Sequence, residues 1–314
     1  MTAALGAPSR AAQSSAPSRP RKPFPWFKYL SVAPLGLFFL ALIAFPVGLL
    51  LWMSFGDVRL VAGHFLWRGV GFDNYIAMFS DKVFGIALWN SFVFIFFTVT
   101  ITILLGIGLA LVTDRLVRAQ QFAQNVLIWP AVIAPVVISV VWLLILSPQI
   151  GLLNKILISF GISPQAWLGE PTGAMASIIL VDLWHWTPIV FLFVYTALRG
   201  IDSSVLEASS VDGATYAKTI RYVVLPLLVP AIVGVAAIRL VMGVKAFDEM
   251  YLLTFGGPGT ATTVITIYLR QVFFESFEYG YGAALSVTVV VVVVLVIALV
   301  ILARSIGKRF SRGE

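Results

Sequence analysis

Six long apolar stretches limit what this chain can fold into. A helix needs roughly 20 apolar residues to cross the hydrocarbon core of a membrane. We predict six such spans, at Leu30–Phe55, Gly85–Val112, Phe122–Leu146, Gly173–Leu198, Val223–Met242 and Gly282–Ala303. Residues 289–296 are all valine or leucine and would favour a strand in water, but in lipid the backbone must satisfy its own hydrogen bonds, which favours a helix. The sequence therefore predicts an all-α membrane protein with six transmembrane helices.

The polar remainder of the chain is small. Only 11% of the residues are charged, against about 25% in a soluble domain, so no separate soluble domain is expected. We predict a disordered basic arm over residues 1–28, one transmembrane domain over 29–304 and a basic tail over 305–314. The arm followed by an apolar run resembles a signal peptide, but the run is much longer than the roughly 7–15 apolar residues of such a peptide. It is predicted to be a retained first helix.

The placement of basic residues predicts the orientation. Fourteen Lys and Arg residues lie in the arm, the tail and the connections on one side of the spans, and six lie on the other side. The positive-inside rule places the richer side in the cytoplasm. Both termini are then cytoplasmic, which requires an even number of spans. Orientation also explains the net charge of +7, so no nucleic-acid partner is expected, and the chain is expected to contact membrane lipid.

Several kinds of chemistry are excluded by composition. The chain has no cysteine and two histidines, His64 and His185, which excludes disulfides and thiolate sites and argues against a metal centre. It also lacks the G-x-x-x-x-G-K-[ST] loop that holds nucleotide phosphates. We therefore expect no metal and no cofactor bound by this chain.

The connection at 199–225 carries the most specific pattern. It reads as two short helices joined at a turn: Asp202 and Ser203 can cap the first helix, and Gly213 can take the positive φ that ends it. Pro226, beyond this connection, is expected either at a tolerated kink or in the first turn of the fifth span. An ordinary amphipathic cytoplasmic loop would show some of these features, but not their full spacing. The residues that carry the pattern are Glu207, Ala208, Ser209, Asp212, Gly213, Ala214, Leu225 and Pro226.

These residues resemble the EAA loop of the permease subunits of binding-protein-dependent ABC importers, with Ser209 in place of the third residue, alanine. Further segments resemble the carbohydrate-uptake group of that family, which includes maltose-type and glycerol-phosphate-type permeases. They are Phe72–Tyr75, Phe247–Thr254, Gly256–Gly259 and Tyr279–Ser286.

The resemblance implies a type I importer permease fold in the bacterial cytoplasmic (inner) membrane. It implies that Glu207–Ala214 docks in a cleft on a separate ATPase, which binds ATP and Mg²⁺ and performs the hydrolysis, so that this chain is not itself an enzyme. It further implies four kinds of partner: a second homologous permease, expected to be a different chain, two ATPase subunits and an extracytoplasmic solute-binding protein. Alternating access would carry a sugar or sugar-like solute between the two permeases.

Two charged residues fall inside predicted spans. Asp182 and Arg239 are costly at a helix centre, by about 2.5–3.5 kcal/mol each on insertion scales. One interpretation places them along the substrate pathway. The other places them near the interface, with Arg239 extended outward to water.

The aromatic residues of the fourth span allow two interpretations. Trp184 and Trp186 could stack on a sugar ring, or they could only pack around a kink at Pro188. Trp142 and Tyr195 are weaker pathway candidates of the same kind.

On the outer side, the segment that includes Phe247, Asp248, Glu249, Gly257 and Pro258 is a candidate gate or contact for the binding protein. Its two acids are expected to be solvated.

Three other classes of function are weaker. A secondary transporter would need inverted repeats and intramembrane carboxylates for ion coupling, and Asp182 alone is insufficient. A membrane enzyme would need a cluster of catalytic side chains, which the cytoplasmic acids do not form outside the loop at 199–225. A receptor or scaffold explains none of the motifs.

Overall fold

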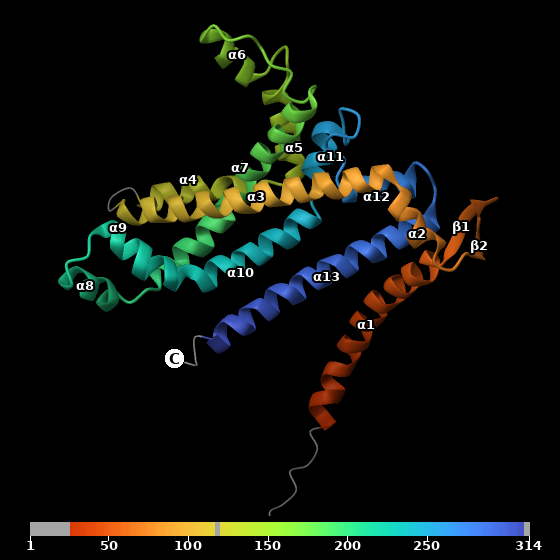
Figure 1. Cartoon of the computed structure of the whole chain (residues 1–314), viewed down its shortest axis with the longest axis horizontal. Coiled ribbons are helices and arrows are strands. Elements are labelled where there is room, and N and C mark those ends of the chain that lie inside the picture. Colours follow the sequence, from red (N-terminus) through yellow and green to blue (C-terminus); the bar gives the residue numbers. More distant parts are fainter. Residues whose placement is uncertain (1–25, 117–119, 311–314) are drawn as a thin grey trace, which may run out of the picture. The chain divides into compact units, whose positions relative to one another are not determined.

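The computed structural model describes residues 26–116 and 120–310. Residues 1–25 of the arm predicted over 1–28, and 311–314 of the tail predicted over 305–314, lie outside these residues. The remainder is helical instead: residues 26–28 begin α1, and 305–310 continue α13. The elements are helices except for one short two-stranded ribbon (Figure 1). Trp26–Gly48 and Leu49–Glu314 are separate compact units.

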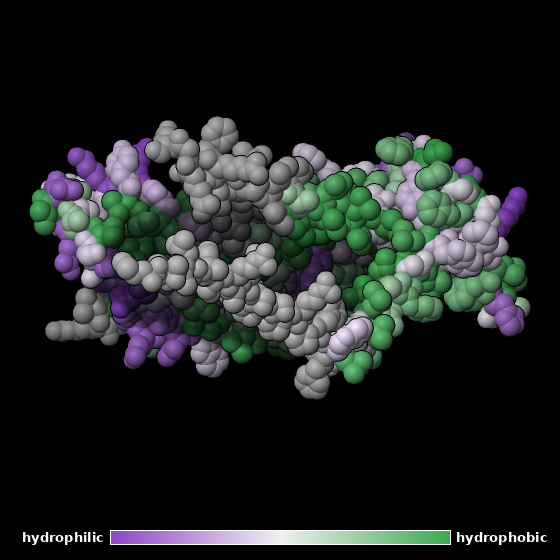
Figure 2. All heavy atoms as spheres, turned by 90° about the horizontal axis from the view of Figure 1, so that it is seen from below, coloured by the Kyte–Doolittle hydropathy of each residue, from purple (hydrophilic) through white to green (hydrophobic). Residues whose placement is uncertain are grey.

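Five helices of the described residues are long and apolar enough to span a membrane, and a bent pair makes a sixth candidate. The long helices are α1 (Trp26–Ser54), α3 (Lys82–Arg115), α7 (Pro171–Arg199), α10 (Leu225–Val244) and α13 (Tyr279–Phe310). Helix α13 runs well beyond Ala303, the predicted end of the last span. Figure 2 shows apolar side chains over the middle of the molecule and hydrophilic ones gathered at the end that carries α8 (Ser203–Val211) and α9 (Tyr216–Thr219).

The predicted third span is not one straight helix. It consists of α4 (Gln120–Val132) and α5 (Pro135–Ile145), which meet at an angle of 98°. Pro135 disfavours the helical conformation of the residue before it, and Ala134 is accordingly extended, with φ −63° and ψ 139°. The span predicted at Phe122–Leu146 is therefore present as a candidate, but it is broken between α4 and α5.

The fifth span begins earlier than predicted. Helix α9, a π-helical turn at Ile220–Val224 and α10 form one continuous span. In the π turn, the Leu225 N–H donates to the Ile220 carbonyl, five residues back. Pro226 follows directly, in the first turn of α10. The wider π turn lies just before Pro226, which has no N–H and would therefore interrupt α-helical hydrogen bonding.

Short elements connect the spans. They are strands β1 (Gly56–Val61) and β2 (His64–Gly69) and helices α2 (Asp73–Ser80), α6 (Leu152–Ser159), α11 (Asp248–Thr254) and α12 (Ile265–Phe274). The two strands pair antiparallel around Ala62 and Gly63, which both have positive φ, as a two-residue hairpin turn requires. The hairpin was not predicted from the sequence.

The closest helix packing joins α3 and α7 at Gly106. A Cβ atom at this position would lie 2.6 Å from Val190 Cγ1 and 3.0 Å from the Phe191 backbone nitrogen. Around this crossing, Ala110, Val190, Phe191 and Val194 are buried. Small residues allow such close contact between membrane helices, where dispersion forces drive association.

We predict that Gly106→Ala destabilises the protein by about 1–3 kcal/mol, because the added methyl group meets backbone as well as side chain. Thermal unfolding in mild detergent would measure the effect. Gly108→Ala is the matched control, since a Cβ atom there meets nothing within 4 Å. Equal melting temperatures for the two variants would contradict this account of the crossing.

Candidate functional site

The connection at 199–225 forms a compact element at one end of the molecule. Helix α8 begins after Asp202, whose carboxylate accepts a hydrogen bond from the Ser204 backbone N–H at 2.9 Å. This bond lowers the pKa of the Asp202 carboxyl below its ordinary value. Ser203, the other predicted capping residue, is instead the first residue of the helix.

Helix α8 ends as the sequence predicted. Gly213 has φ 72°. The Ala214 N–H donates to the Ser209 carbonyl at 3.0 Å, and the Gly213 N–H donates to the Ser210 carbonyl at 3.1 Å. This pair of bonds is a Schellman motif, in which a residue with positive φ closes the helix.

Ser209 links the two short helices. Its hydroxyl is buried, donates to the Leu206 carbonyl at 2.8 Å and lies 3.2 Å from the Thr219 hydroxyl oxygen. The other side chains of the motif point outward: Glu207, Ala208 and Asp212 are exposed, and Val211 is 87% exposed. The element therefore combines a fixed backbone with a free outer surface, as a docking site for another protein requires.

This element also contacts the neighbouring spans, so we name it the coupling element (Ser203–Thr219). The Arg115 guanidinium at the end of α3 lies 3.3 Å from the centre of the Tyr216 ring. Asp114 and Arg199 form a 3.4 Å ion pair between the ends of α3 and α7. Both contacts are largely exposed and each is worth at most about 1 kcal/mol. The first joins the element to α3, and the second joins α3 to the end of α7 that leads into the element.

A buried group of ionisable residues lies among α7, α10 and α11. We name Asp182, His185, Arg239 and Glu249 the charge cluster. Arg239 donates to Asp182, and His185 Nδ1 is hydrogen-bonded to the Glu249 carboxylate. Asp182 and His185 are three residues apart and so share one face of α7. All four side chains are buried, Arg239 with 0% exposure.

The charge cluster corrects two expectations. Arg239 does not extend outward to water, because its guanidinium is paired inside the helix bundle. Glu249 is not solvated, whereas its neighbour Asp248 is exposed. No local sequence pattern indicates the contact between His185 and Glu249, which are 64 residues apart. Among the described residues no group of three potential ligands could hold a metal ion.

The predicted aromatic candidates occupy different places. Trp186 lies beside the charge cluster, with its ring 4.2 Å from that of His185 and 5.9 Å from the Arg239 guanidinium. Trp184 is partly exposed and meets Trp142 edge to face at 5.8 Å. Tyr195 is buried and hydrogen-bonded to Gln120 of α4, away from the other candidates. Pro188 is buried within α7, which continues through it.

The predicted outer segment contains one member of the charge cluster. Helix α11 carries Glu249. Phe247, the residue before this helix, stacks on Tyr251 within it, with ring centres 5.1 Å apart. The chain then turns at Phe255, Gly256 and Gly259, which all have positive φ. Gly257 and Pro258 lie in this turn, whose carbonyls accept hydrogen bonds from Thr262 and Thr263. The turn is thus an ordered loop.

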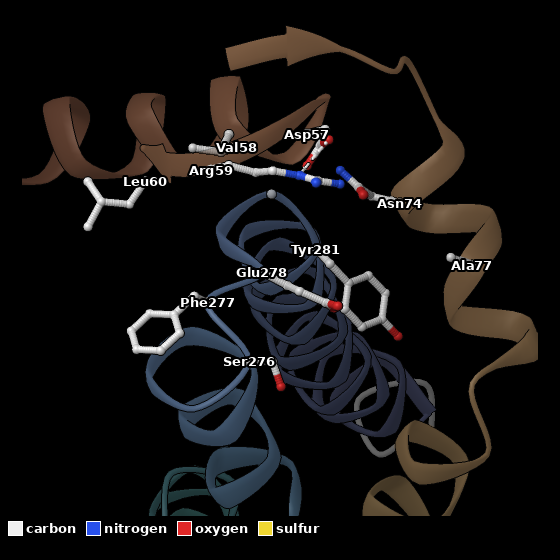
Figure 3. A pocket seen from close by; sticks show the side chains of 11 residues that line it. Asp57, Val58, Arg59, Leu60, Asn74, Ala77, Ser276, Phe277, Glu278 and Tyr281 are labelled. Atoms are coloured by element: carbon white, nitrogen blue, oxygen red, sulfur yellow. Dashed lines mark hydrogen bonds and ion pairs between the residues drawn. The ribbon is translucent and has the colours of Figure 1, made fainter. Parts of the chain in front are cut away.

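A cavity of about 550 Å³ lies between β1, α2 and the start of α13 (Figure 3). Its polar side chains include Asp57, Arg59, Asn74 and Glu278. Asn74 donates to the carbonyls of Ser54 and Gly56 at 2.9 and 3.1 Å, so the motif predicted at Phe72–Tyr75 fastens α2 to the strand.

Beside this cavity, Asp81 joins three helices. Burial opposes its ionisation, but hydrogen bonds from the hydroxyls of Tyr268 and Tyr281 and from the backbone N–H groups of Phe84 and Val83 outweigh it, so the pKa of the Asp81 carboxyl is lowered. The two backbone bonds cap α3, and the tyrosines belong to α12 and α13.

The comparisons with known proteins agree with this geometry, which defines a helical membrane protein. Residues 21–312 match the family described as "Binding-protein-dependent transport system inner membrane component". The chain belongs to this family of permease subunits of ABC importers.

Individual relatives are consistent with that assignment. A probable ABC transporter permease, y4oQ of Sinorhizobium fredii, is 36% identical over 157 residues, half of each chain. The trehalose/maltose permease MalF of Thermococcus litoralis is 30% identical over 80% of this chain and 84% of its own. A permease in the crystal structure of a bacterial importer of alginate has the same fold, with a TM-score of 0.79 and 24% identity over 90% of this chain and 96% of its own.

We predict that Arg239→Met destabilises the protein by about 3–5 kcal/mol, because it leaves the Asp182 carboxylate buried and unpaired. The double variant Arg239→Met/Asp182→Asn should recover most of this loss, since neither charge remains. Thermal unfolding of the purified protein in detergent measures both. A double variant no more stable than the single one would show that the pair is not the source of the effect.

We predict that low pH weakens the hydrogen bonds by which Asp81 joins α3 to α12 and α13. Because the folded-state pKa lies below the ordinary value of 3.8, its contribution to stability is complete above that value and is lost as the pH falls through the folded-state pKa. The melting temperature of Asp81→Asn should therefore fall less than that of the parent protein between pH 5 and about pH 3. Parallel profiles for the two proteins would contradict this.

Proposed function

We propose that this chain forms one half of the translocation pathway of an ATP-driven importer and is coupled to a separate ATPase through the coupling element. One observation carries the proposal. The capped helix α8 ends at Gly213 in a closed turn, and exposed side chains, including Val211, surround that turn. A preorganised backbone with exposed side chains suits a protein-binding surface, because little conformational entropy is lost when the partner binds.

The expected partners follow from this function. They are a second, homologous but different permease, two ATPase subunits and an extracytoplasmic binding protein. ATP and Mg²⁺ would be bound by the ATPases, and this chain would bind no cofactor. The basic residues near the coupling element, which include Arg115, Arg199, Lys218 and Arg221, support a cytoplasmic position for this end and for both termini.

The proposed solute is a sugar or a sugar-like molecule. The relative named for trehalose and maltose transport supports this class. Trp184 is the exposed aromatic candidate for contact with the solute, with Trp142 beside it. We propose that the pathway wall is supported from inside the bundle by Asp182, Arg239 and Trp186. The opposite charges of Asp182 and Arg239 neutralise each other there. Tyr195 is proposed only as a contact within the helix core.

Transport would proceed by alternating access. Closure of the ATPases would displace the coupling element, and its contacts with α3, α7 and α10 would carry that displacement into the spans. The outer segment at 247–259 would face the binding protein.

A pull-down of the tagged chain from native membranes in mild detergent, followed by mass spectrometry, tests the proposal. We expect an ATPase, a second permease and a solute-binding protein. Recovery of the chain alone, under conditions that preserve a known importer complex, would favour a self-contained carrier instead.

We predict that Gly213→Val reduces ATP-driven uptake by at least tenfold without reducing the amount of protein in the membrane. A β-branched residue is strongly disfavoured at φ 72°, so the turn should lose its shape. Gly213→Asn is the control, because asparagine tolerates positive φ and a Cβ atom at this position meets nothing within 4 Å. Normal uptake by the valine variant would count against the role given to this turn.

A further inference from the structure

The hairpin of β1 and β2 is amphipathic. Residues directly opposite each other in an antiparallel pair lie on the same face. The register places Val58 opposite Trp67 and Leu60 opposite Phe65 on one face, which is entirely apolar beyond the paired glycines 56 and 69. On the other face, Asp57 is opposite Arg68, Arg59 is opposite Leu66, and Val61 is opposite His64.

Much of the apolar face is uncovered within this chain. Val58 is buried, but Leu60 is 48% exposed and Phe65 is 62% exposed. All six residues of β2 are exposed. A two-stranded hairpin is at best marginally stable in water, and one that exposes large apolar side chains needs a further surface to contact.

The hairpin is fixed at a definite level of the molecule. It follows α1 directly after Ser54, and its first strand touches the first turn of α13: a Cβ atom on Gly280 would lie 1.9 Å from the Gly56 carbonyl oxygen. Candidate spans end at Ser54 and begin at Lys82 and Tyr279. The hairpin therefore lies where three spans meet the same side of the membrane.

The apolar face continues the apolar surface of the spans. Trp67 stacks on Trp52 in the last turn of α1, with ring centres 4.9 Å apart and planes 15° apart. Phe65 meets Tyr279 of α13 edge to face at 5.3 Å. Tryptophan and tyrosine are enriched where spans meet the membrane–water interface.

We propose that the hairpin is an interfacial anchor, whose apolar face lies in the headgroup region of the outer leaflet while Arg68 remains at the level of the lipid phosphates and Arg59 stays paired with Asp57. The lipid surface is favoured over a protein partner because the apolar face is continuous, through Trp52 and Tyr279, with the exposed apolar surfaces of α1 and α13. Basic side chains beside an apolar face suit phosphate headgroups. The inference rests on the membrane embedding of the chain and on the proposed cytoplasmic position of its termini, and it is independent of the solute and of the ATPase.

Neighbouring residues on opposite faces provide a matched test. The chain contains no cysteine, so single cysteines can be introduced without removing any. Leu60→Cys reports on the apolar face, and Val61→Cys, at an aliphatic residue of similar exposure (50%), reports on the polar face. Each variant would carry a nitroxide label in nanodiscs of phosphatidylcholine and phosphatidylglycerol, and collisions with oxygen and with a water-soluble nickel chelate would be measured.

The label at Leu60 should lie roughly 5–10 Å below the phosphates and favour collisions with oxygen, as a reference label at Val290 of α13 should. The label at Val61 should favour the nickel chelate, as a label at Val211 of α8 should. Phe65→Cys and His64→Cys repeat the comparison on β2 in case a variant at 60 or 61 unfolds.

Two results would overturn the proposal. In the first, the labels at Leu60 and Val61 are equally accessible to the nickel chelate. In the second, the label at Leu60 is protected only after the extracytoplasmic binding protein is added, which would identify the hairpin as a protein-docking surface. Neither result would bear on the role of the coupling element.

Discussion

Backbone hydrogen bonding in an apolar solvent is the constraint on which the rest of this structure depends. Lipid offers no partners to a free N–H or C=O group, so a sequence as rich in valine as residues 289–296 forms a helix. The same constraint limits where helices break. The bend between α4 and α5 and the separation of α10 from α11 occur where other parts of the chain cover the backbone: Ile138 and Met250 belong to one buried cluster with Phe94 and Ile178.

The helical architecture could be predicted from the sequence because it depends on local properties. Apolar length located the spans, and capping chemistry at Asp202 and Gly213 located the ends of α8. The hairpin was missed because its local signals are weak. Its two-residue turn is Ala62-Gly63, a weaker signal than Asn-Gly, and its strands are short. The bend at Pro135 had a local signal in the spacing of Pro130 and Pro135, but a membrane helix can also tolerate proline.

The candidate site was less predictable because it depends on contacts between distant segments. Asp182 and Arg239 could be identified as unusual, since charges are rare in spans, but their pairing required the packing of α7 on α10. Glu249 looked like a loop residue because its neighbours are Asp248 and a glycine-rich turn. Only the fold shows that its carboxylate meets His185. Ser209 looked like a neutral departure from the motif, yet its hydroxyl meets Thr219.

The length of α3 connects two features that were described separately. Its 34 residues correspond to roughly 51 Å of continuous helix at 1.5 Å per residue. One end is held by Asp81 to the tyrosines of α12 and α13, and the other end places Arg115 on Tyr216 of the coupling element. A helix held at both ends transmits a displacement along its axis. Under the proposed function, a movement of the coupling element would reach the contacts of Asp81 as a displacement along this helix, so that the two faces of the membrane would be mechanically in series through a single helix.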